Sequence, residues 1–235
     1  MERSDMINGL IFDKDGTLFD FRISWGRWAA GFLASVAQSP LHAARLGRAI
    51  GFDPATLTFA ADSPVIAATA ADIAAALAPH LPGQTVPALT AMIDETAGAA
   101  PMSEAVPLRP LLAALRARGL KLGVATNDSE VPARQHLAAH GITDCFDFIA
   151  GYDSGHGAKP GPGMCLAFAG SLGLNPARVA MIGDSRHDLE AGRAAGMRCV
   201  AVLTGVASHA DLAPHADVVL PDIGALPAWL SGLDG

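Results

Sequence analysis

The stretch GLIFDKDGTLFD, residues 9–20, decides the fold, because it joins an apolar run to a tight polar turn. Its first four residues are apolar or small, which is typical of a strand buried inside a parallel sheet. Asp13 and Asp15 follow at once, with Gly16 and Thr17 behind them. Ligands of open parallel sheets bind beyond the carboxyl ends of the strands. The stretch therefore predicts a first strand over residues 6–13 that ends in two carboxylates of a functional site.

Alternating apolar and amphipathic segments continue from about Val106 to the end of the chain. Apolar runs predict strands at 120–126, 145–151, 178–184, 198–205 and 217–222. The amphipathic segments between them predict helices, several of which close on the glycine expected just past a helix end. This alternation predicts an α/β fold with a doubly wound, mostly parallel sheet and helices on both faces.

Residues 19–102 have a different composition and pattern: they are rich in alanine and contain no convincing strand. We expect helices near 25–38, 41–50, 66–78 and 86–98, and therefore an all-helical cap domain inserted after the first strand. Residues 1–18 and 103–235 would form the core domain. Trp25, Trp28 and Phe32 recur at helical spacing and are interpreted as core packing of this insert, and Arg22 and Arg27 as solvated residues.

The composition and charge of the chain argue against a nucleic-acid partner and against a membrane span. The chain has 235 residues, 51% of them hydrophobic and 17% charged, with a net charge of -7. No block of Lys and Arg can follow a phosphate backbone, so a nucleic-acid partner is not expected. The longest uncharged stretch, residues 73–93, contains three prolines, so no membrane span is expected either. The start does not resemble a signal peptide, and the three cysteines show no C-x-x-C spacing, which favours a cytoplasmic protein. The oligomeric state stays open.

Polar residues after the other predicted strands complete the candidate site. Thr126 and Asn127 follow one strand, Asp184 and Asp188 follow another, and Lys159 lies in the loop GHGAKPGPG. Carboxylates are ligands that Mg²⁺ prefers, and a lysine and a hydroxyl can take phosphate oxygens. One carboxylate would be free to act as a nucleophile and another as a general acid. The set predicts Mg²⁺-dependent phosphoryl transfer on a small phosphorylated metabolite.

Each motif by itself has a plainer interpretation. A D-x-D-G turn can be only a turn, GDSRHD can be only a helix start, and a single lysine in a loop is usually solvated. The first motif is not an EF-hand, because Ser24 stands where that loop needs a glutamate. The functional interpretation depends on four strand or loop ends that carry the required residues in the right order.

The motifs DKDGTL, VATND, KPGPG and GDSRHD together resemble those of the haloacid dehalogenase superfamily, and the whole chain resembles its phosphoglycolate-phosphatase-like branch. The resemblance implies that Asp13 attacks phosphorus to form an aspartyl-phosphate, while Asp15 protonates the leaving oxygen and later activates water. Asp13, the backbone carbonyl of Asp15, and Asp184 would hold Mg²⁺.

Further roles are implied by the same resemblance. Thr126, Asn127 and Lys159 would bind the phosphoryl group, and Asp188 would serve near the metal or the lysine. One departure is Lys14, which stands between the aspartates where that branch more often has an apolar or aromatic residue. The sequence leaves open whether Lys14 alters the field of the site or points away from it.

The resemblance favours a phosphatase acting on a phosphoglycolate-like ester or a sugar phosphate. Dehalogenases of the superfamily lack the second aspartate, and phosphonatases use a lysine of the cap, whereas residues 19–102 contain no lysine. A sugar phosphomutase is left as an alternative, because it shares the whole constellation. A catalytically silent regulator that binds a phospho-ligand is a second alternative.

Overall fold

A six-stranded parallel sheet forms the centre of the molecule, in a computed structural model that describes residues 6–60, 63, 65–66 and 68–233. The strand order is β5-β4-β1-β6-β7-β8, and every neighbouring pair is parallel. The strands are β1 (Gly9–Phe12), β4 (Lys121–Ala125), β5 (Phe148–Ala150), β6 (Val179–Gly183), β7 (Arg198–Val202) and β8 (Val218–Leu220). The predicted doubly wound sheet is confirmed, and its first strand lies in the middle.

Helices cover both faces of this sheet, as the alternation of buried side chains requires. Leu10 and Phe12 of β1 pack with leucines of α5 (Leu108–Ala117) and α10 (Leu226–Leu233). Ile11, which points to the opposite face, packs with α7 (Gly163–Ser171) and α8 (Arg186–Ala194). The remaining core helices are α6 (Glu130–Ala139) and the short α9 (His209–Leu212).

Glycines end the core helices as the sequence predicts. Gly119, Gly141, Gly173 and Gly196 follow α5, α6, α7 and α8, and each has a positive φ between 62° and 83°. A residue with a Cβ adopts this conformation only with strain, so glycine is the natural stop signal.

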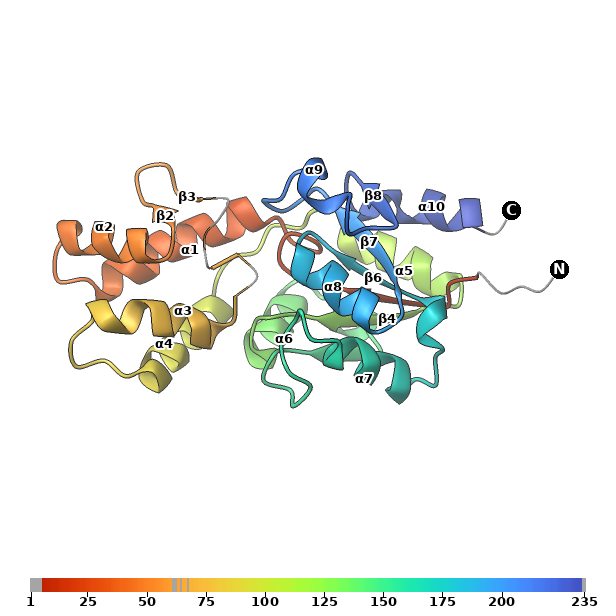
Figure 1. Cartoon of the computed structure of the whole chain (residues 1–235), viewed down its shortest axis with the longest axis horizontal. Coiled ribbons are helices and arrows are strands. Elements are labelled where there is room, and N and C mark those ends of the chain that lie inside the picture. The colour runs from red at the N-terminus through yellow and green to blue at the C-terminus, as the bar shows by residue number, and fades with distance from the viewer. Residues whose placement is uncertain (1–5, 61–62, 64, 67, 234–235) are drawn as a thin grey trace.

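The segment between β1 and β4 supplies four helices that share a hydrophobic cluster of their own. They are α1 (Phe21–Val36), α2 (Pro40–Ala49), α3 (Ala70–Leu77) and α4 (Val86–Gly98), and Figure 1 shows them gathered at one end of the molecule. The expectation of an insert without strands is corrected in one detail, because β2 (Phe52–Asp53) and β3 (Thr58–Phe59) form a small antiparallel ladder. Two-residue strands are too short to leave a period in the sequence.

Two adjacent chain segments connect the insert to the core. Asp20 N donates a hydrogen bond to Ser103 O at 2.8 Å, and Ala105 N donates to Leu18 O at 2.9 Å. The outgoing and returning chains therefore run side by side close to the end of β1. None of the helices in the described part of the chain combines the length and hydropathy needed to cross a membrane.

Candidate active site

The polar residues that follow the parallel strands meet in one pocket. Asp13 follows β1, Thr126 follows β4 and Asp184 follows β6, and all three line the pocket together with Lys159 and Asp188. Because β4, β1 and β6 are neighbours in the sheet, their carboxyl ends lie at the same edge. The expectation that these residues come together agrees with the structure.

Lys159 is the buried cation of this cluster. Its Nζ donates to Asp13 Oδ1 at 2.5 Å, to Asp188 Oδ1 at 2.6 Å and to the carbonyl of Ala125 at 2.8 Å. Asn127 brackets the lysine backbone, accepting from Lys159 N at 2.8 Å and donating to Lys159 O at 2.9 Å. The Asn127 side chain thus fixes the loop that carries the lysine, and its direct contact with a phosphoryl group stays a prediction.

Three buried carboxylates could hold a divalent cation. Asp13, Asp184 and Asp188 each offer an oxygen, and these atoms lie within 4.8 Å of one another. Burial raises the pKa of Asp13 to about 7 although Lys159 opposes it, and burial also raises the pKa of Asp184 well above its usual value. Three carboxylates facing one ammonium leave an excess of negative charge, and hard oxygen donors of this kind fit Mg²⁺. The Asp15 side chain points elsewhere, so only its backbone is available for the predicted metal contact.

Gly16 is required by the shape of this cluster. Its φ is +83°, and a Cβ placed on it would overlap the carboxylate of Asp184. A Cβ on Gly205 would overlap the same carboxylate. The two glycines therefore form a close-fitting cradle for Asp184, which explains why glycine follows the second aspartate of the turn.

Lys14 does not point away from the site but lies completely buried beside Asp15. Its Nζ is 2.7 Å from Asp15 Oδ2 and 3.2 Å from Asp128 Oδ2, and it lies 5.3 Å from the centre of the Trp25 ring. Burial by itself would lower the pKa of Lys14, but the two carboxylates outweigh it and raise that pKa. Trp25 Nε1 also donates to Asp15 Oδ1 at 2.8 Å. Asp15 is therefore held by a lysine and an indole.

Asp128 and His136 are the residues of this network that the sequence did not single out. Burial raises the pKa of Asp128 to about 6 against the opposing charge of Lys14. His136 Nε2 lies 2.8 Å from the carbonyl of Ala97, so Nε2 carries the hydrogen and Nδ1, 3.2 Å from Lys14 Nζ, accepts. Burial and the neighbouring Lys14 lower the pKa of His136 to about 4. Asp128 directly follows the Thr126-Asn127 pair and was therefore a detectable signal, whereas His136 becomes a neighbour only in the folded chain.

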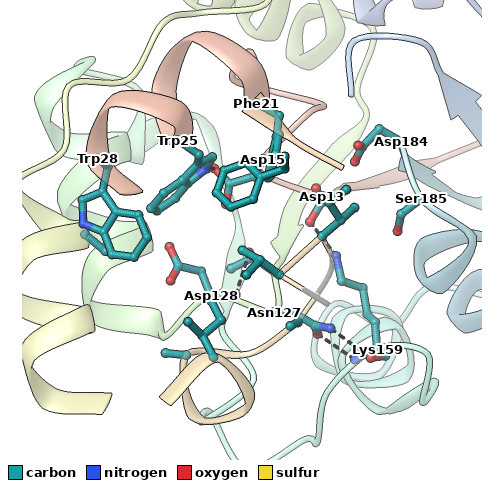
Figure 2. Close-up of a pocket in the computed structure, with 18 of the residues that line it drawn as sticks. Asp13, Asp15, Phe21, Trp25, Trp28, Asn127, Asp128, Lys159, Asp184 and Ser185 are labelled. Atoms are coloured by element: carbon teal, nitrogen blue, oxygen red, sulfur yellow. Dashed lines mark hydrogen bonds and ion pairs between the residues drawn. The ribbon is translucent and has the colours of Figure 1, made fainter. Parts of the chain in front are cut away.

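The pocket has two halves of opposite character, which we call the polar half and the apolar half. The core contributes nine described lining residues, all of them polar: Asp13, Asp15, Thr126, Asn127, Asp128, Lys159, Asp184, Ser185 and Asp188. The insert contributes eleven described lining residues, all of them apolar, among them Phe21, Trp25, Trp28, Phe59, Ile73 and Ile93. Figure 2 shows the rings of Trp28, Trp25 and Phe21 on one side of the pocket, with Asp13 and Lys159 beyond them. Trp25 and Trp28 thus face the pocket as well as each other, whereas Phe32 is buried in the insert as predicted.

Comparison with known proteins agrees with this geometry. The model of the family described as haloacid dehalogenase-like hydrolase matches residues 7–196. A phosphoglycolate phosphatase of Rhodospirillum rubrum is 32% identical over 96% of this chain and 91% of its own length. A phosphoglycolate phosphatase of Neisseria meningitidis is 39% identical over 49% of this chain and 50% of its own.

Solved structures share the fold at low sequence identity. CbbY from Rhodobacter sphaeroides, crystallised in complex with phosphate, has a TM-score of 0.75 at 21% identity, covering 94% of this chain and 96% of that one. A putative beta-phosphoglucomutase from Thermotoga maritima has a TM-score of 0.69 at 19% identity, covering 96% and 99% of the two chains. At such identities the likeness extends to the fold alone.

Proposed function

The chain belongs to the haloacid dehalogenase-like hydrolases and is a phosphatase, and we propose that it hydrolyses a small phosphomonoester with Mg²⁺ through a phosphorylated Asp13. The observation that carries the proposal is the convergence of Asp13, Asp184 and Asp188 around the buried Lys159. Side chains that can serve as a nucleophile, as a cation for the phosphoryl oxygens and as metal ligands therefore lie in one pocket, which supports the proposal.

In the first step, a carboxylate oxygen of Asp13 attacks phosphorus and the bond from phosphorus to the leaving alcohol breaks. Asp15 donates a proton to the departing oxygen, and Lys159 offsets the negative charge on the phosphoryl oxygens. In the second step, Asp15 takes a proton from water, whose oxygen attacks phosphorus and releases phosphate and Asp13. The hydrogen bonds from Lys14 and Trp25 hold the Asp15 carboxylate in position for both transfers.

Mg²⁺ would be held by Asp13, Asp184 and the backbone carbonyl of Asp15, with Asp188 beside it. When bound, it supplies positive charge next to the phosphoryl group and offsets the excess of carboxylates. Thr126, whose hydroxyl accepts from Asp128 N at 3.0 Å, would contribute a further polar contact to the phosphoryl oxygens.

Residues 19–102 would act as a cap that keeps bulk water from the pocket. The free, buried thiols of Cys145, Cys165 and Cys199 suit a cytoplasmic location.

The test is phosphate release from small phosphomonoesters with and without Mg²⁺, compared between the native protein and Asp13→Asn. We expect release that needs Mg²⁺ and falls at least about 1,000-fold in the variant, since the nucleophile is lost. Asp144→Asn is the matched control, because this carboxylate is 69% exposed and pairs with surface Arg109. Full activity of Asp13→Asn would refute the proposed nucleophile, and no release from any ester would favour a silent binding protein.

A second experiment tests the covalent intermediate. With methanol added as a competing acceptor, a phospho-enzyme divides its phosphoryl group between water and methanol in the same ratio whichever ester formed it. We expect one ratio of methyl phosphate to phosphate for esters with different leaving groups. A ratio that changes with the leaving group would mean that water attacks the substrate directly.

A further inference from the structure

The apolar half of the pocket lies where the leaving group of a bound phosphomonoester must go. The phosphoryl group is confined to the polar half, because Asp13 and Lys159 are there. The rest of the substrate then extends toward the insert, whose described lining residues are all apolar. The pocket is open to solvent, so its lining does not enclose the leaving group on every side. A leaving group larger than two or three carbon atoms can therefore extend along the apolar lining toward the opening.

Among the described residues, no cation is placed to receive a second negative charge on the substrate. The insert has four arginines, Arg22, Arg27, Arg45 and Arg48, and all are exposed and absent from the described lining of the pocket. Lys159 is engaged with Asp13 and Asp188, and Lys14 lies behind Asp15 and Asp128.

A carboxylate on the leaving group would face a double penalty in this pocket. It would lose its water against apolar side chains, and it would lie near Asp15 and Asp128, which border the pocket. A polyhydroxylated leaving group would leave its hydroxyls without partners along the same wall. Aromatic and branched apolar groups, in contrast, gain contact area with Trp28, Phe59 and Ile93.

Resting on the proposed phosphatase activity, we infer that the substrate is a monoester of an uncharged alcohol that carries a bulky apolar or aromatic group. Trp25, Trp28 and Phe21 form the aromatic side of its subsite, and Ile73 and Ile93 belong to the aliphatic side. The substrate class therefore differs from the one in the name of the Rhodospirillum rubrum relative, whose phosphoglycolate carries a carboxylate on the leaving group.

Four esters with matched alkyl attachment test this inference: 2-phenylethyl phosphate, ethyl phosphate, phosphoglycolate and phosphocholine. We expect kcat/KM for 2-phenylethyl phosphate to exceed that for ethyl phosphate by about 100-fold, the factor that burial of a phenyl ring supplies. Phosphoglycolate should be hydrolysed more slowly than ethyl phosphate. A preference for phosphoglycolate, or for the cationic phosphocholine, would overturn the inference and leave the phosphatase activity intact.

Measuring the affinity for each ester without turnover distinguishes failure of the substrate inference from failure of the proposed phosphatase activity. Two of the three tryptophans, Trp25 and Trp28, line the pocket, so tryptophan fluorescence reports on its occupancy in Asp13→Asn, which cannot turn over. Tighter binding of 2-phenylethyl phosphate than of phosphoglycolate supports the inference even if no ester is hydrolysed. Equal or weaker binding overturns it.

Two variants on α1 test whether its aromatic side chains cause the preference for 2-phenylethyl phosphate. Trp28→Ala should lower the preference for 2-phenylethyl over ethyl phosphate about 10-fold. Ile23→Ala, a change on the same helix at a residue that is 57% exposed, should leave the preference unchanged. An unaltered preference in Trp28→Ala, with a native circular dichroism spectrum, would contradict the assignment of the aromatic side.

Discussion

Replacing Lys14 with methionine removes the buried cation that lies between two largely buried carboxylates. Lys14 is fully buried, and its Nζ lies 2.7 Å from Asp15 and 3.2 Å from Asp128. Removing one partner from a buried ion pair costs about 3–5 kcal/mol of the free energy of unfolding, because the remaining charge is poorly solvated and has no counterion. Methionine keeps most of the side-chain volume, so loss of the charge is the main change.

The dependence of this loss on pH follows from Asp128. Its pKa is already raised to about 6 with Lys14 present, and it would rise further without the cation. A carboxyl group whose pKa is higher in the folded than in the unfolded chain loses stability as pH rises through these values. We therefore expect the loss in Lys14→Met to be largest near pH 8 and smaller near pH 5, where Asp128 takes up a proton.

Urea unfolding at both pH values measures this effect, with Lys121→Met as the matched control. Lys121 also pairs with an aspartate, at 3.0 Å from Asp147, but its side chain is 49% exposed. An exposed pair is worth about 0–1 kcal/mol, so the control should unfold almost as the native protein does. If Lys14→Met unfolded within about 1 kcal/mol of the native protein at pH 8, Lys14 would not be compensating buried charge.

Three further changes test other parts of the site. Gly16→Ala should abolish phosphate release, because its Cβ overlaps the Asp184 carboxylate, and measurable turnover would show that the cradle is not tight. Chelation with EDTA should stop phosphate release and Mg²⁺ should restore it, with Asp184→Asn needing more Mg²⁺; release that is indifferent to EDTA would exclude the proposed metal. The pKa of His136, about 4 when folded, is below its ordinary 6.5, so the unfolded chain binds the proton first and stability should fall between about pH 6.5 and 4. Urea unfolding at pH 7 and 5.5 should show a smaller fall in His136→Gln, and an equal fall would mean that His136 does not titrate this way.

The position of the site was predictable because the carboxyl ends of parallel strands lie at one edge of the sheet. Apolar runs located the strands, and the residue after each run had to lie at one edge, so the gathering of Asp13, Thr126 and Asp184 followed from order alone. Asp188 was expected near the metal or the lysine, and it contacts the lysine at 2.6 Å. The position of the preceding strand was enough to place these residues, because each lies within a few positions of the end of its strand.

The direction of the Lys14 side chain, between the two aspartates, was not predictable from the sequence. Lys14 lies in the turn beyond β1, where strand alternation no longer fixes the direction of a side chain. Its partners His136 and Asp128 come from α6 and from the turn that precedes α6. His136 is 122 residues away in the chain, and only packing of α6 brings it near. The aromatic residues of α1 presented the same difficulty, because helical spacing is identical for a ring that faces a core and one that faces a pocket.

The division of the pocket between two chain segments has a consequence for how such an enzyme can diversify. Every described apolar residue of the pocket lining is encoded between positions 19 and 102, and every described polar one is encoded outside that range. Mutations of the apolar residues that do not contact Asp15 can therefore change selectivity without altering the residues that act on phosphorus. Because the two connecting segments are hydrogen-bonded side by side, the insert leaves the core and rejoins it at one place in the fold.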